Sequence, residues 1–205
     1  MPLPTSQQMK QTHNTRLTDA FAYASHWHRT QVRKGAAPGE APIPYMAHIL
    51  SVTSLVIQAG GDEDEVIAAL LHDVPEDHGG QPRLDEIREM FGDRVADIVE
   101  GLSDHLGPEG QKADWWERKR AYVAHKRHAD RSTQMVCAAD KLDNLRTTLA
   151  DHARIGDAVW ARFKTGREGQ AWYYEAVCSA IEAGPNADLQ PVRDLRAAIR
   201  SLDSA

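Results

Sequence analysis

The sequence predicts a single all-α domain, a helical bundle around one core. Apolar residues recur at spacings of three or four along most of its 205 residues, which is the period of amphipathic helices. Segments in which apolar and polar residues alternate, as they do in half-buried strands, are absent from the sequence. With 41% hydrophobic and 26% charged residues, the composition is typical of a globular chain long enough to bury one core.

The first predicted helix covers residues 17–33, and residues 1–16 before it are predicted to form an N-terminal arm. Arg33 and Lys34 would end this helix, where its dipole favours cations. The segment 35–44 that follows is rich in Pro and Gly and is predicted to be a loop. The apolar face of the helix is expected to consist of four residues at helical spacing: Leu17, Phe21, Ala24 and His28.

The second predicted helix begins near Pro44, because proline suits the first turn of a helix. It is expected to run to about Ala59, where Gly60–Gly61 ends it. Its inward face would carry three aliphatic residues: Ile49, Val52 and Val56.

The third predicted helix has a clear start and a clear end. Asp62 and Glu65 form the pattern of a capping box at its start. Because its sequence, EVIAALLHDV, is apolar nearly all round, we expect this helix to be buried. Pro75 disfavours helical geometry at Val74, so the helix is expected to end about there.

Helices separated by polar or glycine-containing segments account for the rest of the chain. We expect two short helices broken near Gly92, a loop at 103–114, and helices near 115–128, 131–150 and 168–182. Residues 184–205 are predicted to be a C-terminal helix packed on the outside or a frayed tail. The domain itself is therefore expected to span residues 17–183.

Charge and composition exclude several classes of partner. A formal net charge of −6 argues against a nucleic-acid backbone as the partner, since that role normally needs a basic face. No apolar run approaches the roughly 20 residues that span a bilayer, and the start of the chain lacks the apolar segment of a signal peptide. Only two cysteines are present, so a reducing cytoplasm is the expected location.

Four residues with metal-binding side chains lie in apolar, helix-like stretches. His48, the pair His72–Asp73 and Asp140 would supply two imidazoles and two carboxylates, a mixed donor set that suits Mn²⁺ or Fe²⁺. The alternative is that these residues cap helices or pair at the surface. A charged pair at the end of a run as apolar as VIAALL is costly unless it is paired or coordinated, which favours metal binding. Four protein ligands would leave positions open for water or substrate, so the first interpretation is a metal-dependent hydrolase.

Four motifs carry a resemblance to a known family. In order they are VRKG at 32–35, PYMAHILSV at 44–52, ALLHDVPED at 69–77 and ADKLDNL at 139–145. Together they resemble the HD-domain superfamily of metal phosphohydrolases, and more narrowly the hydrolase domain of RelA/SpoT enzymes and the small alarmone hydrolases. The similarity spans roughly residues 17–182.

The resemblance implies a role for each matched residue. It makes four residues the ligands of Mn²⁺, or of Fe²⁺ or another divalent ion: His48, His72, Asp73 and Asp140. It places Glu76 and Asp77 beside the attacking water, where a carboxylate can take a proton. An alternative for this acidic pair is to hold a ligating histidine in place. Six further residues are expected to contact the nucleotide: Arg33, Lys34, Tyr45, Lys141, Asn144 and Tyr173.

The reaction implied by the family is removal of pyrophosphate from the 3′ position of (p)ppGpp, the alarmone of the stringent response, or of its adenosine counterpart (p)ppApp. Base identity stays open because GAAPGEAP lengthens the loop at 35–44 and Val-Pro stands inside the acidic motif. Two alternatives remain: a phosphohydrolase of another nucleotide, such as a nucleoside monophosphate or NADPH, and a non-catalytic alarmone-binding module. The expected partner is a small-molecule nucleotide, with no nucleic acid and no membrane; a homodimer is left open.

The basic and aromatic run WWERKRAYVAHKRH at 115–128 allows two interpretations. It is expected to be a solvated helix face, because charge runs on helices usually face water. The other interpretation places it at the mouth of the active site, with Arg118 or Arg120 holding a phosphate.

Overall fold

The computed structural model describes residues 15–35, 41–108 and 111–203. Residues 1–14 of the predicted arm (1–16) and residues 36–40 of the predicted loop lie outside that range. Within it the regular secondary structure is helical, apart from one isolated β-bridge between Val32 and Pro44, so the all-α prediction is confirmed. The elements are α2 (Thr15–Trp27), α3 (Met46–Gln58), α4 (Glu63–Leu71), α5 (Val74–His78), α6 (Gln81–Phe91), α7 (Asp93–Leu102), α8 (Trp115–Lys126), α9 (Arg131–Ile155), the 3₁₀ helix η2 (Gly156–Arg162), α10 (Gly166–Glu182) and α11 (Gln190–Asp203).

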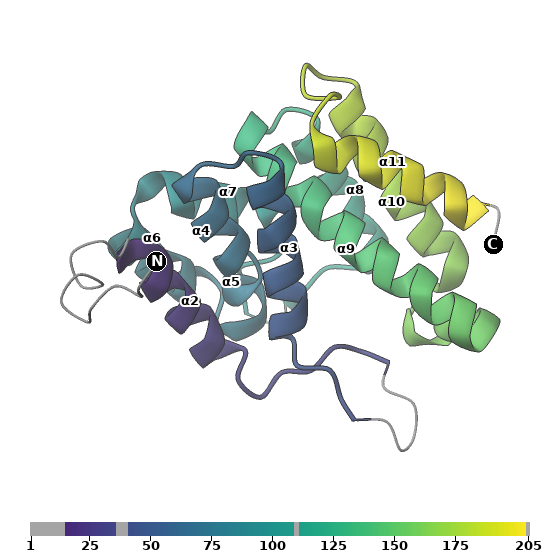
Figure 1. Ribbon diagram of the computed structural model, residues 1–205, viewed down its shortest axis with the longest axis horizontal. Helices are drawn as coiled ribbons and strands as arrows, with labels where there is room; N and C mark the ends of the chain where they lie inside the picture. The colour runs from purple at the N-terminus through teal and green to yellow at the C-terminus, as the bar shows by residue number, and fades with distance from the viewer. Residues whose placement is uncertain (1–14, 36–40, 109–110, 204–205) are drawn as a thin grey trace, which may run out of the picture.

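Helix α4 lies at the centre of the N-terminal half, in contact with α2, α3, α7 and α9 (Figure 1). Both hydrogen bonds of the predicted capping box are present, because Asp62 accepts from the Glu65 amide and Glu65 accepts from the Asp62 amide. Every residue from Glu65 to Leu71 is buried, as the apolar composition of this helix predicted. A helix enclosed on all sides places whatever follows its C-terminal end inside the protein, and the next residue is His72.

The end of α4 differs from the prediction. The helix stops at Leu71, with His72 as its C-cap, rather than at Val74. Pro75 stands in the first turn of the short helix α5 instead of merely ending its predecessor, because a proline needs no hydrogen-bonded amide there. The tight joint between the two helices lets His72 and Asp73 face the same point despite being neighbours in sequence.

The first predicted helix is wrong at its C-terminal end and in one inward residue. Helix α2 ends at Trp27, so Arg33 and Lys34 do not stand at a helix terminus. The chain leaves the helix because the backbone of residues 31–33 bonds to residues 43–45 instead: Arg33 N–H donates to Ile43 O, and Tyr45 N–H to Gln31 O, both at 2.9 Å.

The buried face of α2 is centred on Ala20 and Ala24, with His28 buried just beyond the helix end, whereas Phe21 is 45% exposed. Phe21 therefore stands beside the buried stripe rather than in it. On α3 the three predicted inward residues are all fully buried: Ile49, Val52 and Val56.

The C-terminal half is organised around α9, the long green helix of Figure 1. It extends to Ile155, beyond the predicted end near residue 150. Helix α11 packs along α9 and α10, so residues 190–203 form a helix rather than a frayed tail. Its buried contacts are made by four aliphatic residues: Val192, Leu195, Ile199 and Leu202. No helix in the described part of the chain is both long and apolar enough to cross a membrane.

Candidate functional site

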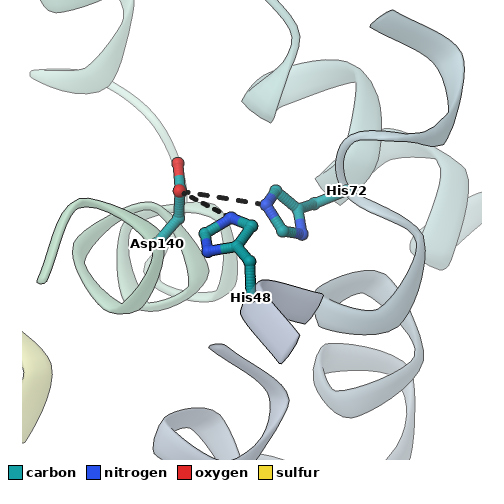
Figure 2. A group of neighbouring side chains, drawn as sticks. All are labelled: His48, His72 and Asp140. Carbon is teal, nitrogen blue, oxygen red and sulfur yellow. Dashed lines mark ion pairs between the residues drawn. The ribbon is translucent and has the colours of Figure 1, made fainter. Parts of the chain in front are cut away.

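Four elements bring the candidate metal ligands to one point. His48 comes from the first turn of α3, His72 from the end of α4, Asp73 from the joint with α5, and Asp140 from the middle of α9. His48, His72 and Asp140 are buried and point toward one another (Figure 2). The Asp140 Oδ1 atom lies 3.3 Å from His48 Nε2 and 3.9 Å from His72 Nε2.

Asp73 completes the group on the open side. Its Oδ2 atom lies 3.1 Å from His72 Nε2 and 3.5 Å from His48 Nε2. Bonds of about 2.1 Å to a shared divalent ion place neighbouring donors roughly 3 Å apart. The separations in this group are therefore those of donors around a single cation. The Tyr45 hydroxyl donates to the same Asp73 oxygen at 2.6 Å, which fixes that carboxylate.

The two imidazoles are already in the tautomer that a metal needs. His72 Nδ1 donates to the Ala69 carbonyl at 2.9 Å, and His48 Nδ1 donates to Asp143 Oδ2 at 2.6 Å. In the neutral imidazole each Nε2 therefore carries a lone pair directed at the cluster. Both Nε2 atoms are buried and have no hydrogen-bond partner among the described residues. Two such nitrogens facing two carboxylates fit a divalent ion with mixed nitrogen and oxygen ligands.

The cluster also attracts positive charge. Burial alone would lower the pKa of His48, but the surrounding carboxylates of Asp140, Asp143 and Asp73 raise it well above its usual value. Burial opposes ionisation of Asp140, yet the neighbouring Lys141 ammonium, 2.5 Å from its Oδ2, and His48 hold the pKa of Asp140 below its usual range. The carboxylates are thus ionised and ready to receive a cation.

A cavity of about 380 Å³ opens beside this cluster. Asp73 and Asp140 line it, while His48 and His72 lie behind them. Both predicted catalytic acids, Glu76 and Asp77, also line it, as do all six residues that were expected to contact the nucleotide: Arg33, Lys34, Tyr45, Lys141, Asn144 and Tyr173.

The acidic pair on α5 faces the cavity rather than the histidines. Glu76 Oε2 accepts from the Asp104 backbone amide at 3.3 Å, and its Oε1 lies 3.4 Å from Lys112 Nζ. Asp77 Oδ2 accepts from the Gln31 amide at 2.7 Å. Burial first, and then the negative charge of Asp104, raise the pKa of Glu76 to about 7. A carboxylate with that pKa can take a proton near neutral pH.

The residues expected to contact substrate surround the cavity in different ways. Arg33 is largely buried and donates to Asp143 at 3.0 Å and to Asn144 at 3.3 Å. Lys34 is exposed at the rim. Lys141 Nζ lies 5.5 Å from the centre of the Tyr173 ring, whose buried hydroxyl has no partner in the described part of the chain.

Helix α8 is not simply a solvated face, because Tyr122 and Lys126 on it are buried. Lys119, which the sequence did not single out, lines the cavity and lies 2.6 Å from Asp104 Oδ2. Arg118 pairs with the other oxygen of Asp104, and Arg120 does not line the cavity; its guanidinium lies 5.8 Å from the centre of the Trp116 ring. The cation that this helix offers to the cavity is therefore Lys119.

Sequence reasoning also missed Asp143, the buried partner of His48. One signal could have found it. Asp140 and Asn144 share a helix face because they are four residues apart, and a residue three positions after Asp140 lies on that face as well. Lys119 and Asp104 carried no such signal, since only the fold brings Lys119 to the cavity and Asp104 to Glu76.

The chain is similar to known proteins in both sequence and structure. A family model described as an HD domain matches residues 20–171. A Drosophila melanogaster protein named guanosine-3′,5′-bis(diphosphate) 3′-pyrophosphohydrolase is 33% identical over 158 residues, covering 73% of this chain and 82% of that protein. The mouse protein of that name is 36% identical, covering 63% and 68%. An Aquifex aeolicus relative is 34% identical over 66% of this chain, which spans only 18% of that longer protein.

Solved structures show the same likeness across the fold. One, described as a metazoan ortholog of SpoT that hydrolyses ppGpp, superposes with a TM-score of 0.71 and 26% identity over 98% of both chains. A protein of Listeria monocytogenes EGD-e superposes with a TM-score of 0.66 and 29% identity, covering 77% of this chain and 99% of that one.

Proposed function

The chain belongs to the HD domain family, and on that premise we propose that it is a metal-dependent hydrolase which removes pyrophosphate from the 3′ position of guanosine 3′,5′-bis(diphosphate). The observation that carries this proposal is the meeting of two histidines and two aspartates beside a cavity that also presents Glu76 and Asp77. The names of the relatives indicate the substrate, and the residues around the cavity indicate the type of reaction.

The proposed cofactor is Mn²⁺, with Fe²⁺ or another divalent ion as the alternative. The donors that would hold it are His48, His72, Asp73 and Asp140, a set of two nitrogens and two or more oxygens that suits these ions. A bound divalent ion supplies an activated water at neutral pH and neutralises negative charge on a phosphoryl oxygen.

The residues on α5 would then move the proton and orient attack. Glu76 has a pKa of about 7, so its carboxylate can accept the proton of the attacking water near neutral pH. Asp77, held by Gln31, would orient that water or a second one. The Nδ1 atoms of His48 and His72 are already occupied by other acceptors, which favours this role over holding a ligating histidine.

Cations around the cavity would hold the phosphates of the substrate. Arg33 and Lys34 line the cavity, and so do Lys119 and Lys141, whose ammonium groups lie near the Tyr173 ring. Guanidinium groups bind phosphate with paired N–H donors, whereas lysines act as point charges. Asn144 and Tyr45 would contact the nucleotide as well, in agreement with their place on the cavity wall.

Partner and location follow the same proposal. We expect a small-molecule nucleotide as partner, no nucleic acid because of the net charge of −6, and no membrane. Both cysteines are free and buried, which suits a cytoplasmic protein, and a homodimer is left open. The domain proper would span residues 17–183, with residues 184–205 as an appended segment.

The decisive experiment incubates the purified chain with Mn²⁺ and ppGpp, and separately with ppApp, and resolves the products by ion-exchange chromatography. Release of intact pyrophosphate together with the nucleoside 5′-diphosphate supports the proposal, and the ratio of the two rates gives the base preference. Samples with EDTA, and Glu76→Gln protein, serve as controls.

Two outcomes would replace the proposal with one of its rivals. Orthophosphate alone, released from GMP or NADPH as readily as from ppGpp, would indicate a phosphohydrolase of another nucleotide. Equilibrium binding of ppGpp without turnover in the presence of Mn²⁺ would indicate an alarmone-binding module instead.

A further inference from the structure

Asp143 stands at the junction of the metal cluster and the substrate cavity. It is a buried residue of α9, one helical turn after Asp140 and on the same side of the helix. Its Oδ2 atom accepts from His48 Nδ1 at 2.6 Å and from an Arg33 guanidinium nitrogen at 3.0 Å. Its other oxygen accepts from the Ser51 hydroxyl. The Asp143 carboxylate thus accepts hydrogen bonds from two residues of α3 and from one residue of the segment that follows α2.

The contact with His48 controls how that side chain can bind a metal. A carboxylate can only accept, so the neutral imidazole must carry its proton on Nδ1 and keep the Nε2 lone pair for a metal ion in the cluster. Carboxylates in this position also fix the ring orientation and raise the basicity of the ligating nitrogen. The partner of His72 is a neutral backbone carbonyl, so among the two imidazoles only His48 has a charged partner on Nδ1.

The contact with Arg33 fixes a cavity cation at the same time. The guanidinium forks between Asp143 and Asn144, and Asn144 in turn donates to Asp140 Oδ1 at 2.5 Å. Arg33 is therefore connected to two candidate metal ligands, to His48 through Asp143 and to Asp140 through Asn144. A guanidinium held at both nitrogens keeps one orientation, which lowers the entropy cost of using it to bind an anion.

We propose that Asp143 is a positioning residue that sets the metal ligand His48 and the anion-binding Arg33 with a single carboxylate. This inference rests on the proposed function, since it takes the cluster to be a divalent-metal site and the cavity to receive a phosphorylated substrate. It predicts that metal affinity and substrate affinity both depend on a side chain that touches neither ligand.

The test titrates Mn²⁺ alone into metal-free protein and measures the free ion by electron paramagnetic resonance. Loss of such a partner typically lowers metal affinity by about 10- to 100-fold, and we expect a loss in that range for Asp143→Ala. Asp143→Asn should lose less, because the amide oxygen can still accept from His48 while the charge is gone. Asp151→Asn is the matched control: it removes a carboxylate that also lines the cavity and pairs with an arginine, and its Mn²⁺ affinity should stay at the wild-type level.

Steady-state kinetics on ppGpp supply the second readout. At saturating Mn²⁺ the kcat of Asp143→Asn should recover to near the wild-type value, while KM stays raised because the oxygen that Arg33 shares with His48 is no longer charged and holds the guanidinium less firmly. A merely structural role would lower the melting temperature and leave the Mn²⁺ dissociation constant of the folded protein unchanged. Wild-type Mn²⁺ affinity in Asp143→Asn, a variant of nearly the same shape, would overturn the inference.

The two levels of the proposal fail in distinguishable ways. If the wild-type chain bound no Mn²⁺, the proposed function would fail before Asp143 was tested. If the wild type bound Mn²⁺ and cleaved ppGpp but the Asp143 variants matched it in both assays, only the positioning role would be lost.

Discussion

Replacing Glu76 by glutamine should make this protein less active and more stable at the same time. The carboxylate is 24% exposed, and burial is the largest cause that raises its pKa to about 7. The negative charges of Asp104 and Asp73 act in the same direction, and the ammonium groups of Lys119 and Lys112 oppose them. Glutamine has nearly the same shape but cannot ionise, so it removes both the base and the cost of the buried charge.

The magnitude follows from linkage between protonation and folding. A glutamate in an unfolded chain titrates near 4.3, so between about pH 4 and pH 7 the native protein binds more protons than the unfolded chain. Stability therefore falls as the pH rises through that window. Raising the pKa from about 4.3 to about 7, at about 1.4 kcal/mol per pH unit, corresponds to roughly 4 kcal/mol above pH 7 and to less than about 1 kcal/mol at pH 4.5. Solvent reaches part of the carboxylate and screens its charge, which reduces the value above pH 7 to about 2 to 3 kcal/mol.

Urea unfolding of EDTA-treated protein at pH 8 and pH 4.5 measures this difference. Glu76→Gln should gain about 2 to 3 kcal/mol at pH 8 and little at pH 4.5, while its turnover of ppGpp with Mn²⁺ should fall by about 10²- to 10⁴-fold. Glu89→Gln, on an exposed part of α6, is the control that should change neither quantity. A variant no more stable than wild type at pH 8 would refute the electrostatic reasoning, and near-normal turnover would refute the assignment of the base.

Three further predictions concern the metal, the core and the surroundings of the base. Mn²⁺ at about 100 times its Kd should stabilise the wild type by about 2.7 kcal/mol, or roughly 5 to 11 °C in scanning calorimetry, and Asp140→Asn should lose most of that shift; an unchanged shift would contradict the ligand assignment. In urea unfolding, Leu71→Ala should cost about 2 to 5 kcal/mol because Leu71 is fully buried, whereas Leu50→Ala, at a position 47% exposed, should stay within about 0.5 kcal/mol; equal costs would contradict the packing. The acidic limb of the kcat profile should move to lower pH in Asp104→Asn, where a negative charge near the base is lost, and to higher pH in Lys119→Met; shifts in the same direction would be inconsistent with this electrostatic arrangement.

Local signals in the sequence predicted the elements that carry the metal cluster. The capping residues Asp62 and Glu65 fixed where α4 begins, and its nearly continuous apolar composition required burial on all sides. A histidine and an aspartate following such a helix had to meet a partner, because an isolated buried charge is too costly. The family motifs then connected that pair with His48 and Asp140, and the structure brings all four residues together.

Local sequence patterns gave a wrong prediction where the backbone could form hydrogen bonds either within a helix or with a distant segment. The periodicity of residues 17–33 suits a helix throughout, but the backbone beyond Trp27 bonds instead to residues 43–45, far along the sequence. Arg33 consequently lies against α9, where Asp143 and Asn144 receive it, rather than at a helix end. Nothing near Arg33 in the sequence indicates that contact.

By itself, the sequence determined the helical class and the central buried helix, because periodicity, capping and the cost of buried charge act over a few neighbouring residues. The four residues of the cluster were singled out by the motifs that the sequence shares with its family. Only the tertiary structure decided which side chains contact the residues of the site: Asp143 contacts His48, and Asp104 and Lys119 surround Glu76. These contacts join residues more than 25 positions apart, so they depend on how whole helices pack. The spacing of side chains within one helix does not indicate which residues of another helix will contact it.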